Sequence, residues 1–345
     1  NGANNGANNG ANNGANNGAN NGGNNGTPDC LADAFLDVSQ YPGAGADYPD
    51  PELAARCEGD FLIVESNGIP HYEFVSITPN PLSAQTYEWR LARYPEVAAQ
   101  TTDVPLVGAA GVAVNGLPLF GPTEAPQMGS ADPVVDMILD ECAGHTANRG
   151  DYHYHALVTA CLASAATQPG DPSPIVGVAG DGFPIYGPAG CVDADCNEVI
   201  EFQSSWEYLG DIGGAWDNNE YVEKDGPQWL DACNGRVGPD GTYRYHATPD
   251  FPYIVGCFRG TPGAQFGGTG DANNGNNGNP NNNPGPTNCA DDNDCADACR
   301  NGAMGCECVT TPMNEMICAE TCNADADCPD MFRCGREGFC VPPRN

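Results

Sequence analysis

The stretch GVAVNGLPLFGP, residues 111–122, decides how this chain folds, because a close copy of it occurs once more. The second copy, GVAGDGFPIYGP, spans residues 177–188. In each copy an apolar run leads into Asn-Gly or Asp-Gly, dipeptides that tolerate the positive φ angles of a tight turn. Each copy therefore predicts an apolar strand, a turn and a short extended segment.

Two further motifs recur downstream in the same order. The matching pairs are LDECAGH with LDACNGR, at residues 139–145 and 230–236, and GDYHYHA with GTYRYHA, at residues 150–156 and 241–247. We therefore expect two related units, at about residues 111–161 and 177–257. The second unit is enlarged by an insertion around residues 206–229.

Each unit is also expected to contain a helix before its last strand. Asp-Pro at residues 132–133 and Gly-Pro at residues 226–227 resemble a helix cap followed by proline in the first turn. Gly144 and Gly235 stand where such helices would end. The predicted fold class is α+β and strand-rich, with an internally duplicated, disulfide-bonded domain and a small disulfide-rich tail domain.

Two polar tracts divide the chain. Residues 1–26 repeat Asn, Gly and Ala, and residues 263–288 are rich in Asn, Gly and Pro, so neither tract can bury enough apolar surface to offset its backbone entropy. We expect a disordered tract and a linker there, with the duplicated domain at residues 27–262 between them. Residues 289–345 hold ten cysteines and form a cysteine-rich module in which crosslinks substitute for a core.

Charge and cysteine content restrict the partners and the compartment. The chain has 12 basic and 46 acidic residues and a net charge of −34, so it attracts cations and repels nucleic acid and anionic lipid. Its 18 cysteines argue for disulfides formed outside the cytosol, and we expect a secreted or cell-surface protein. No apolar run is long enough to span a membrane. Whether an N-terminal signal or lipid anchor has been removed stays open.

The cysteines of the middle domain can be paired from the repeat, since two units that fold alike should crosslink alike. The expected disulfides are Cys142–Cys161, Cys233–Cys257, Cys191–Cys196 and Cys30–Cys57.

The motif YHYH predicts a metal site. In an extended strand His153 and His155 lie on one face, and Tyr152 and Tyr154 lie on the other. Two imidazoles on one strand face can hold one ion, and neutral imidazole suits zinc and copper. His145 precedes the strand by a short loop and could supply a third ligand.

The two remaining histidines, His71 and His246, are candidates for a further ligand if the tertiary structure brings them close. In the second unit Arg236 and Arg244 replace two of the three clustered histidines. Only the first unit can therefore assemble three imidazoles, and the second becomes a scaffold or an anion-holding partner.

Other residues are expected around the metal without binding it directly: Tyr152, Tyr154, Asp151, Asp181 and Arg244. Tyrosine and histidine are also ordinary strand residues, and aspartate is favoured in the turn that holds Asp181. The structural alternative is that the histidines serve packing alone. If a metal is bound, copper or zinc is expected before iron.

The motifs GDYHYHALV, DGFPIYGP, LDECAGH and YRYHATPDFPYIVGCFRG together resemble the YHYH domain family of secreted bacterial and algal proteins, over about residues 60–262. The resemblance implies an extracellular domain and brings no activity with it. The tail resembles small cysteine-rich repeats in surface proteins of predatory and social bacteria.

The sequence thus predicts an extracellular domain that binds one transition-metal ion. It would be an enzyme if one coordination position stayed open to an extracellular substrate, and no catalytic residue can be assigned. The alternative is a non-catalytic surface module that binds glycans or proteins, with structural histidines. A closed structural metal site is a third hypothesis. No Ser-His-Asp frame, phosphate loop or dinucleotide fingerprint is recognisable.

Overall fold

The computed structural model describes residues 29–162 and 170–267, and the backbone of four short strands nearer the C-terminus. These strands form two antiparallel pairs: β18 (Cys306–Thr310) with β19 (Met316–Glu320), and β20 (Arg333–Cys334) with β21 (Cys340–Val341). The expected disordered tract at residues 1–26, most of the expected linker and the disulfides of the expected cysteine-rich module lie outside the described residues.

An eight-stranded sheet forms the centre of the domain. Its strands, in spatial order, are β15 (Gly235–Val237), β16 (Tyr243–His246), β10 (Pro184–Tyr186), β9 (Ile175–Ala179), β5 (Ala109–Ala113), β6 (Pro118–Phe120), β8 (Tyr152–Tyr154) and β7 (Gly144–Thr146). The central strands β5 and β9 are the two apolar runs that begin the repeated stretches, and they pair antiparallel.

The pairings follow the same order outward from the centre on both sides. β5 pairs antiparallel with β6, β6 pairs parallel with β8, and β8 pairs antiparallel with β7. On the other side β9 pairs antiparallel with β10, β10 pairs parallel with β16, and β16 pairs antiparallel with β15. The predicted turns are confirmed by the left-handed φ angles of Gly116 and Gly182, at 80° and 90°.

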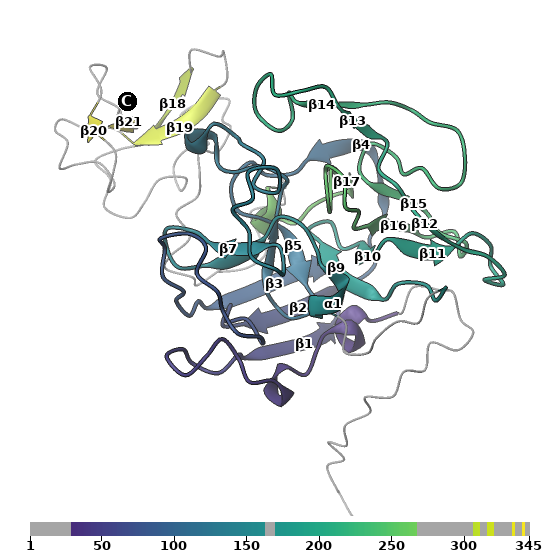
Figure 1. Ribbon diagram of the computed structural model, residues 1–345, viewed down its shortest axis with the longest axis horizontal. Helices are drawn as coiled ribbons and strands as arrows, with labels where there is room; N and C mark the ends of the chain where they lie inside the picture. The colour runs from purple at the N-terminus through teal and green to yellow at the C-terminus, as the bar shows by residue number, and fades with distance from the viewer. Residues whose placement is uncertain are drawn as a thin grey trace, which may run out of the picture.

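Smaller sheets surround this centre. They comprise β1 (Leu53–Glu58), β2 (Phe61–Ser66) and β3 (Tyr87–Ala92) in one antiparallel sheet, and the pairs β4 (Val97–Asp103) with β17 (Cys257–Gly260), β11 (Ala189–Cys191) with β12 (Val199–Glu201), and β13 (Trp206–Tyr208) with β14 (Asn219–Tyr221). Figure 1 shows β1, β2 and β3 below the part of the large sheet that includes β5 and β9. Apolar side chains of both sheets, among them Leu62, Leu91, Val112 and Val178, share one buried core.

The prediction of a helix in each unit is wrong. Among the described residues the α-helix α1 (Thr159–Leu162) has one turn, and the other helical segments are 3-10 turns: η1 (Leu31–Ala34), η2 (Val38–Gln40), η3 (Pro126–Met128) and η4 (Ala264–Phe266). Residues 131–143 and 226–234 form turns and bends instead.

The first expected helix fails for two physical reasons. Asp132 does accept the N–H groups of the next turn, but Val135 and Met137 are exposed by 56% and 85%, so only Val134 of this turn packs against the core. Further along, the side chain of Asp140 accepts the N–H groups of Cys142 and Gly144, which a helix would need. The fold is consequently almost entirely β, and within the described residues the α part of the predicted α+β class is reduced to the single turn of α1.

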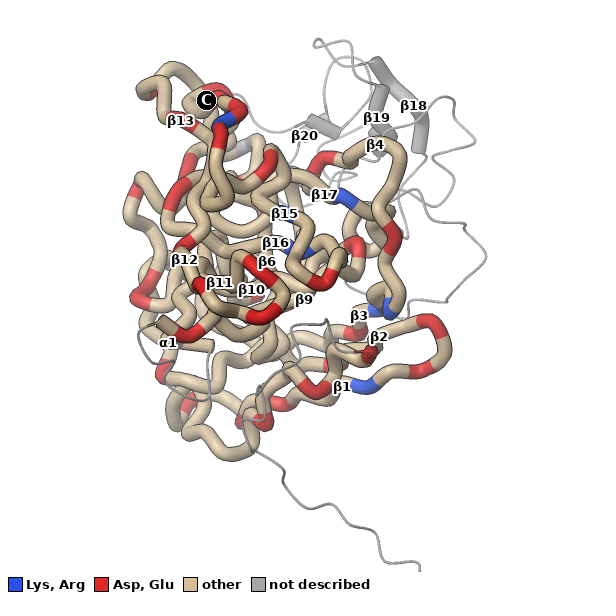
Figure 2. The backbone as a smooth tube through the Cα atoms, turned by 90° about the vertical axis from the view of Figure 1, so that its right-hand side faces the viewer, with Lys and Arg blue, Asp and Glu red and all other residues tan. Residues whose placement is uncertain are grey.

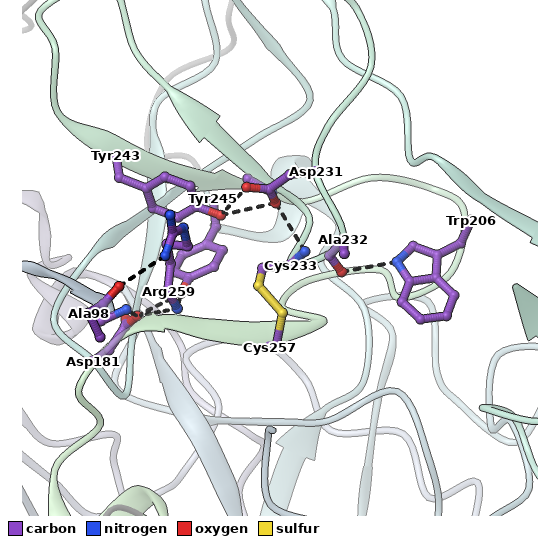
Figure 3. The surroundings of a disulfide bond; sticks show 12 residues. Ala98, Asp181, Trp206, Asp231, Ala232, Cys233, Tyr243, Tyr245, Cys257 and Arg259 are labelled. Atoms are coloured by element: carbon purple, nitrogen blue, oxygen red, sulfur yellow. Dashed lines mark hydrogen bonds between the residues drawn. A yellow bond between two sulfur atoms is a disulfide. The ribbon is translucent and has the colours of Figure 1, made fainter. Parts of the chain in front are cut away.

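Four disulfides join the described cysteines: Cys30–Cys57, Cys142–Cys161, Cys191–Cys196 and Cys233–Cys257. These are the pairs expected from the repeat. Figure 3 shows how Cys233–Cys257 ties the turn before β15 to β17, beside the carboxylate of Asp231.

Acidic residues dominate the surface. Figure 2 shows Asp and Glu on loops around the molecule and basic residues at few positions, in keeping with the net charge of −34. In the part of the chain that the structure describes, no helix has the length and apolarity needed to cross a membrane.

The folded chain continues beyond residue 262, where the sequence places the start of a linker. Phe266 is fully buried, and the side chain of Gln265 accepts the N–H of Arg90 at 2.8 Å. Residues 263–267 therefore belong to the core-forming part of the domain.

We predict that Phe266→Ala lowers the free energy of unfolding by about 3–5 kcal/mol, because it removes a fully buried ring. Denaturant unfolding of the full chain measures this loss. Tyr208→Ala is the matched control: Tyr208 is 59% exposed, so a change within about 0.5 kcal/mol is expected. A loss below about 1 kcal/mol for Phe266→Ala would contradict the extended boundary.

Candidate metal centre

Three histidine side chains meet on one face of the β7–β8 hairpin. His145 stands directly opposite His153 in the antiparallel register, and His155 follows directly after the end of β8, two residues beyond His153. The Nε2 atoms of His145 and His153 are 3.1 Å apart, and those of His153 and His155 are also 3.1 Å apart. All three side chains are buried. The structure thus brings together the three histidines that the sequence singles out, as a group able to hold a metal ion.

The other ring nitrogen of each histidine faces a backbone carbonyl. The three Nδ1 contacts are His145 to Ile138 O at 3.1 Å, His153 to Asp151 O at 3.2 Å and His155 to Gly121 O at 2.7 Å. A carbonyl oxygen can only accept, so Nδ1 carries the hydrogen in each ring. In the neutral ring Nε2 then presents a lone pair, and three lone pairs point at one place.

Burial keeps two of these rings neutral. Loss of solvation lowers the pKa of His153 well below its ordinary value, and it lowers the pKa of His155 to about 4. Neighbouring histidines add to the effect in both cases. Neutral imidazole is the form that binds a metal ion.

Glu124 is a member of the site that the sequence analysis missed. Its Oε1 atom lies 3.2 Å from Nε2 of His145 and 3.6 Å from Nε2 of His155. This oxygen is buried and has no hydrogen-bond partner. Burial alone would raise the pKa of Glu124, but its neighbours His145 and His155 outweigh burial and lower the pKa.

A signal for Glu124 is present in the repeat. Glu124 follows the first repeated stretch by two residues, and Gly190 occupies the equivalent position after the second. The carboxylate is therefore present in the copy that keeps three histidines and absent from the copy that has lost two. Comparison of the copies beyond the repeated stretch would have identified it.

Tyr152 and Tyr154 occupy the reverse face of the strand, as expected from its two-residue period. Tyr72 OH lies 3.1 Å from Tyr152 OH and 2.6 Å from Tyr154 OH. Tyr152 also donates to Asp140 Oδ2 at 2.7 Å, and Asn115 Nδ2 donates to Tyr154 OH at 2.8 Å. This hydrogen-bonded chain fixes β8 from behind and so fixes the direction of the histidines in front.

Of the two aspartates expected around the metal, Asp151 lies beside the histidines and Asp181 does not. Asp151 supplies the carbonyl that orients His153, and its carboxylate lies 4.0 Å from Arg149. Asp181 accepts the phenol of Tyr245 at 2.6 Å and the N–H groups of Arg259 and Gly260, as Figure 3 shows for the first two. Asp181 thus holds β16 against β17, and its carboxylate is directed at these two strands rather than at the three histidines.

Arg244 lies on β16, in the edge hairpin opposite the histidines. Its guanidinium stacks over Tyr186, with 4.8 Å between Cζ and the ring centroid, and it pairs with Asp240 at 2.5 Å. Arg244 therefore lies near the opposite edge of the sheet from the histidine cluster, whereas the sequence analysis expected it beside the metal.

The structure does not bring His71 or His246 to the cluster of three. Nδ1 of His71 faces Asn115 Nδ2 at 3.3 Å, on the tyrosine side of β8. Nδ1 of His246 donates to Gly187 O at 2.8 Å, next to Phe202. Within the described residues Glu124, and neither of these histidines, stands beside the three imidazoles.

Comparison with known proteins gives a family and no characterised relative. A family model described as YHYH protein matches residues 88–260, a range that includes all eight strands of the large sheet, Glu124 and the three histidines. No curated protein and no solved structure matches the chain.

Because His71 is buried, we predict that the folded protein loses stability in acid. Burial lowers its pKa from 6.5 to about 4, so the unfolded chain takes up a proton at a pH where the folded chain does not. The contribution of neutral His71 to the free energy of unfolding is present above pH 6.5 and is lost as the pH falls toward 4. Between pH 7 and pH 5 the wild type should lose about 2 kcal/mol more free energy of unfolding than His71→Gln, measured by denaturant titration. Parallel pH profiles for the two proteins would refute this assignment.

Proposed function

This chain belongs to the YHYH protein family, and we propose that it is an extracellular domain that binds one transition-metal ion through Nε2 of His145, His153 and His155. One observation carries the proposal: three imidazoles, each with Nδ1–H donated to a carbonyl, direct their lone pairs at one buried place. Such lone pairs repel one another unless a cation lies between them. Copper or zinc fits best, because both favour neutral imidazole.

The spacing of the nitrogens supports this proposal. Tetrahedral coordination with metal–nitrogen bonds of about 2.0–2.1 Å separates two ligand nitrogens by about 3.3 Å. The nearest Nε2 atoms are 3.1 Å apart, so an ion would enter with only a small outward movement of the rings.

Glu124 is the proposed fourth partner of the ion. Its orphaned Oε1 offers an anionic ligand, and three imidazoles with one carboxylate form a set that zinc and copper accept. If Glu124 binds the ion directly, the site is closed and the ion stabilises the fold. If Glu124 stays outside the coordination shell, one position is open and the carboxylate is placed to act as a base.

The proposed location outside the cell rests on the disulfides and the charge. Four disulfides in the described residues require an oxidising compartment to form and persist. The acidic surface raises the local concentration of cations and disfavours nucleic acid as a partner. A non-catalytic surface module that binds glycans or proteins is the alternative, in which the histidines serve packing alone.

We also propose that the two halves of the large sheet arose by duplication. The identical order of pairings on either side of β5 and β9 supports this. So do equivalent hydrogen bonds: Tyr152 and Tyr243 donate to Asp140 and Asp231, and His155 and His246 donate to Gly121 O and Gly187 O. In this proposal the middle domain keeps its predicted start near residue 27 and is followed by a separate cysteine-rich module at residues 289–345.

Removal of the strand histidines tests metal binding. The purified chain should bind about one equivalent of zinc or copper, and H153A/H155A should reduce the affinity at least about 100-fold, because two of three imidazoles are lost. Elemental analysis after dialysis and calorimetric titration measure this. His71→Gln is the matched control, since His71 lies behind the strand, and it should keep full binding. Stoichiometric metal in the double variant would overturn the proposal.

Substitution of Glu124 separates a closed from an open site. If the carboxylate is a ligand, Glu124→Gln should weaken binding of cobalt(II), used as a spectroscopic probe, by about 10–100-fold and shift its visible absorption bands. Glu141→Gln, at a residue in the loop before β7, is the control and should change neither. An unchanged spectrum and affinity in Glu124→Gln would show that the carboxylate is no ligand and that a position is open.

A further inference from the structure

The β15–β16 hairpin, at the other edge of the large sheet, carries two arginines where β7–β8 carries two histidines. Arg236 stands directly opposite Arg244 in the antiparallel register, as His145 stands opposite His153. Like charges at directly opposite positions repel and destabilise a strand pair. The arrangement is the more unusual because the chain has 12 basic and 46 acidic residues.

The positive charge of this pair is only partly compensated. Arg244 forms an ion pair with Asp240 at 2.5 Å. Arg236 forms none with any described residue, and its Nη1 donates to Cys191 O at 3.1 Å. Each guanidinium stacks on a ring, Arg236 over Phe202 at 4.3 Å and Arg244 over Tyr186. Two rigid, planar cations therefore stand beside one carboxylate.

Two polar atoms here are buried without a partner: Nε of Arg244, a donor, and Nε2 of His246, an acceptor. His246 Nε2 is an acceptor because Nδ1 donates to Gly187 O. A buried polar atom left without a hydrogen bond is costly, so both atoms call for a ligand. Such a ligand must accept from guanidinium and donate to imidazole.

The carboxylate of the histidine cluster has no equivalent here. Gly190 occupies the position of Glu124, and a Cβ atom at Gly190 would lie 3.2 Å from His246 Cε1. The first hairpin therefore gathers lone pairs and a carboxylate, whereas the second gathers N–H donors and positive charge. The same backbone frame favours a cation at one edge of the sheet and an anion at the other.

We propose that Arg236, Arg244 and His246 bind a phosphate group. Its unprotonated oxygens accept from the guanidinium forks, whose geometry matches phosphate, and its P–OH donates to His246 Nε2. Sulfate offers the same acceptors at neutral pH and lacks the proton. The partly exposed side chain of Arg236 gives the site access to solvent. A phosphate monoester offers the same acceptors, and it keeps a P–OH only below its second pKa of about 6.

Calorimetric titration of the full-length chain with inorganic phosphate, at constant ionic strength and pH 7, tests the site. The H153A/H155A variant is used as well, so that phosphate held by a metal at the histidine cluster cannot contribute. Phosphate should bind both proteins with equal affinity and more tightly than sulfate. Arg236→Gln should weaken phosphate binding at least tenfold, and Arg56→Gln, at an exposed ion pair with Glu65, should not change it.

The remaining outcomes are equally definite. Arg236→Gln must keep the metal stoichiometry of the wild type, which shows that it folds and separates this site from the metal proposal. Phosphoserine and phosphate are also compared at pH 5, where both keep a P–OH. Equal affinity assigns the site to phosphorylated ligands, and phosphate binding alone assigns it to the free anion; both support the site. Absence of binding at millimolar phosphate, or equal binding by Arg236→Gln, overturns it.

Discussion

The alternation of side chains along β8 is the constraint on which the rest of the site depends. The strand and the residue that follows it place His153 and His155 on one side and Tyr152 and Tyr154 on the other. The tyrosines are bound by Tyr72, Asn115 and Asp140, so the strand cannot turn about its axis. The tyrosine side chains on the reverse face of the strand therefore help to orient the imidazoles without contacting them. The carbonyl groups that accept from the Nδ1 atoms orient them directly.

Features that depend on residues close in sequence were predictable. The two strand-turn-strand stretches, the four disulfides and the grouping of His145 with His153 and His155 all follow from a repeat and a two-residue period. The sequence also shows that the second unit cannot assemble three histidines, because Arg236 and Arg244 replace histidines when the two copies are aligned.

Features that depend on burial or on distant loops were not predictable. Proline after a capping residue indicates where a helix can start, but Val135 and Met137 find no core to cover, so no helix forms there. Asp181 resembles an ordinary turn residue until β17 is seen to donate two N–H groups to it. Glu124 and Tyr72 reach the β7–β8 hairpin from loops whose path the strand pattern does not specify.

The Cys142–Cys161 disulfide encloses His145, His153 and His155 within one covalent ring. The segment that carries the proposed ligands is thus a macrocycle, and its imidazoles stay at high local concentration even in a chain that has not yet folded. Chelation by this ring need not wait for the eight-stranded sheet. If the proposed ion is bound, an oxidised nascent chain would capture it within a closed ring and could use it as a template for β7 and β8, whereas a reduced chain would hold the same three side chains in an open and more extended segment.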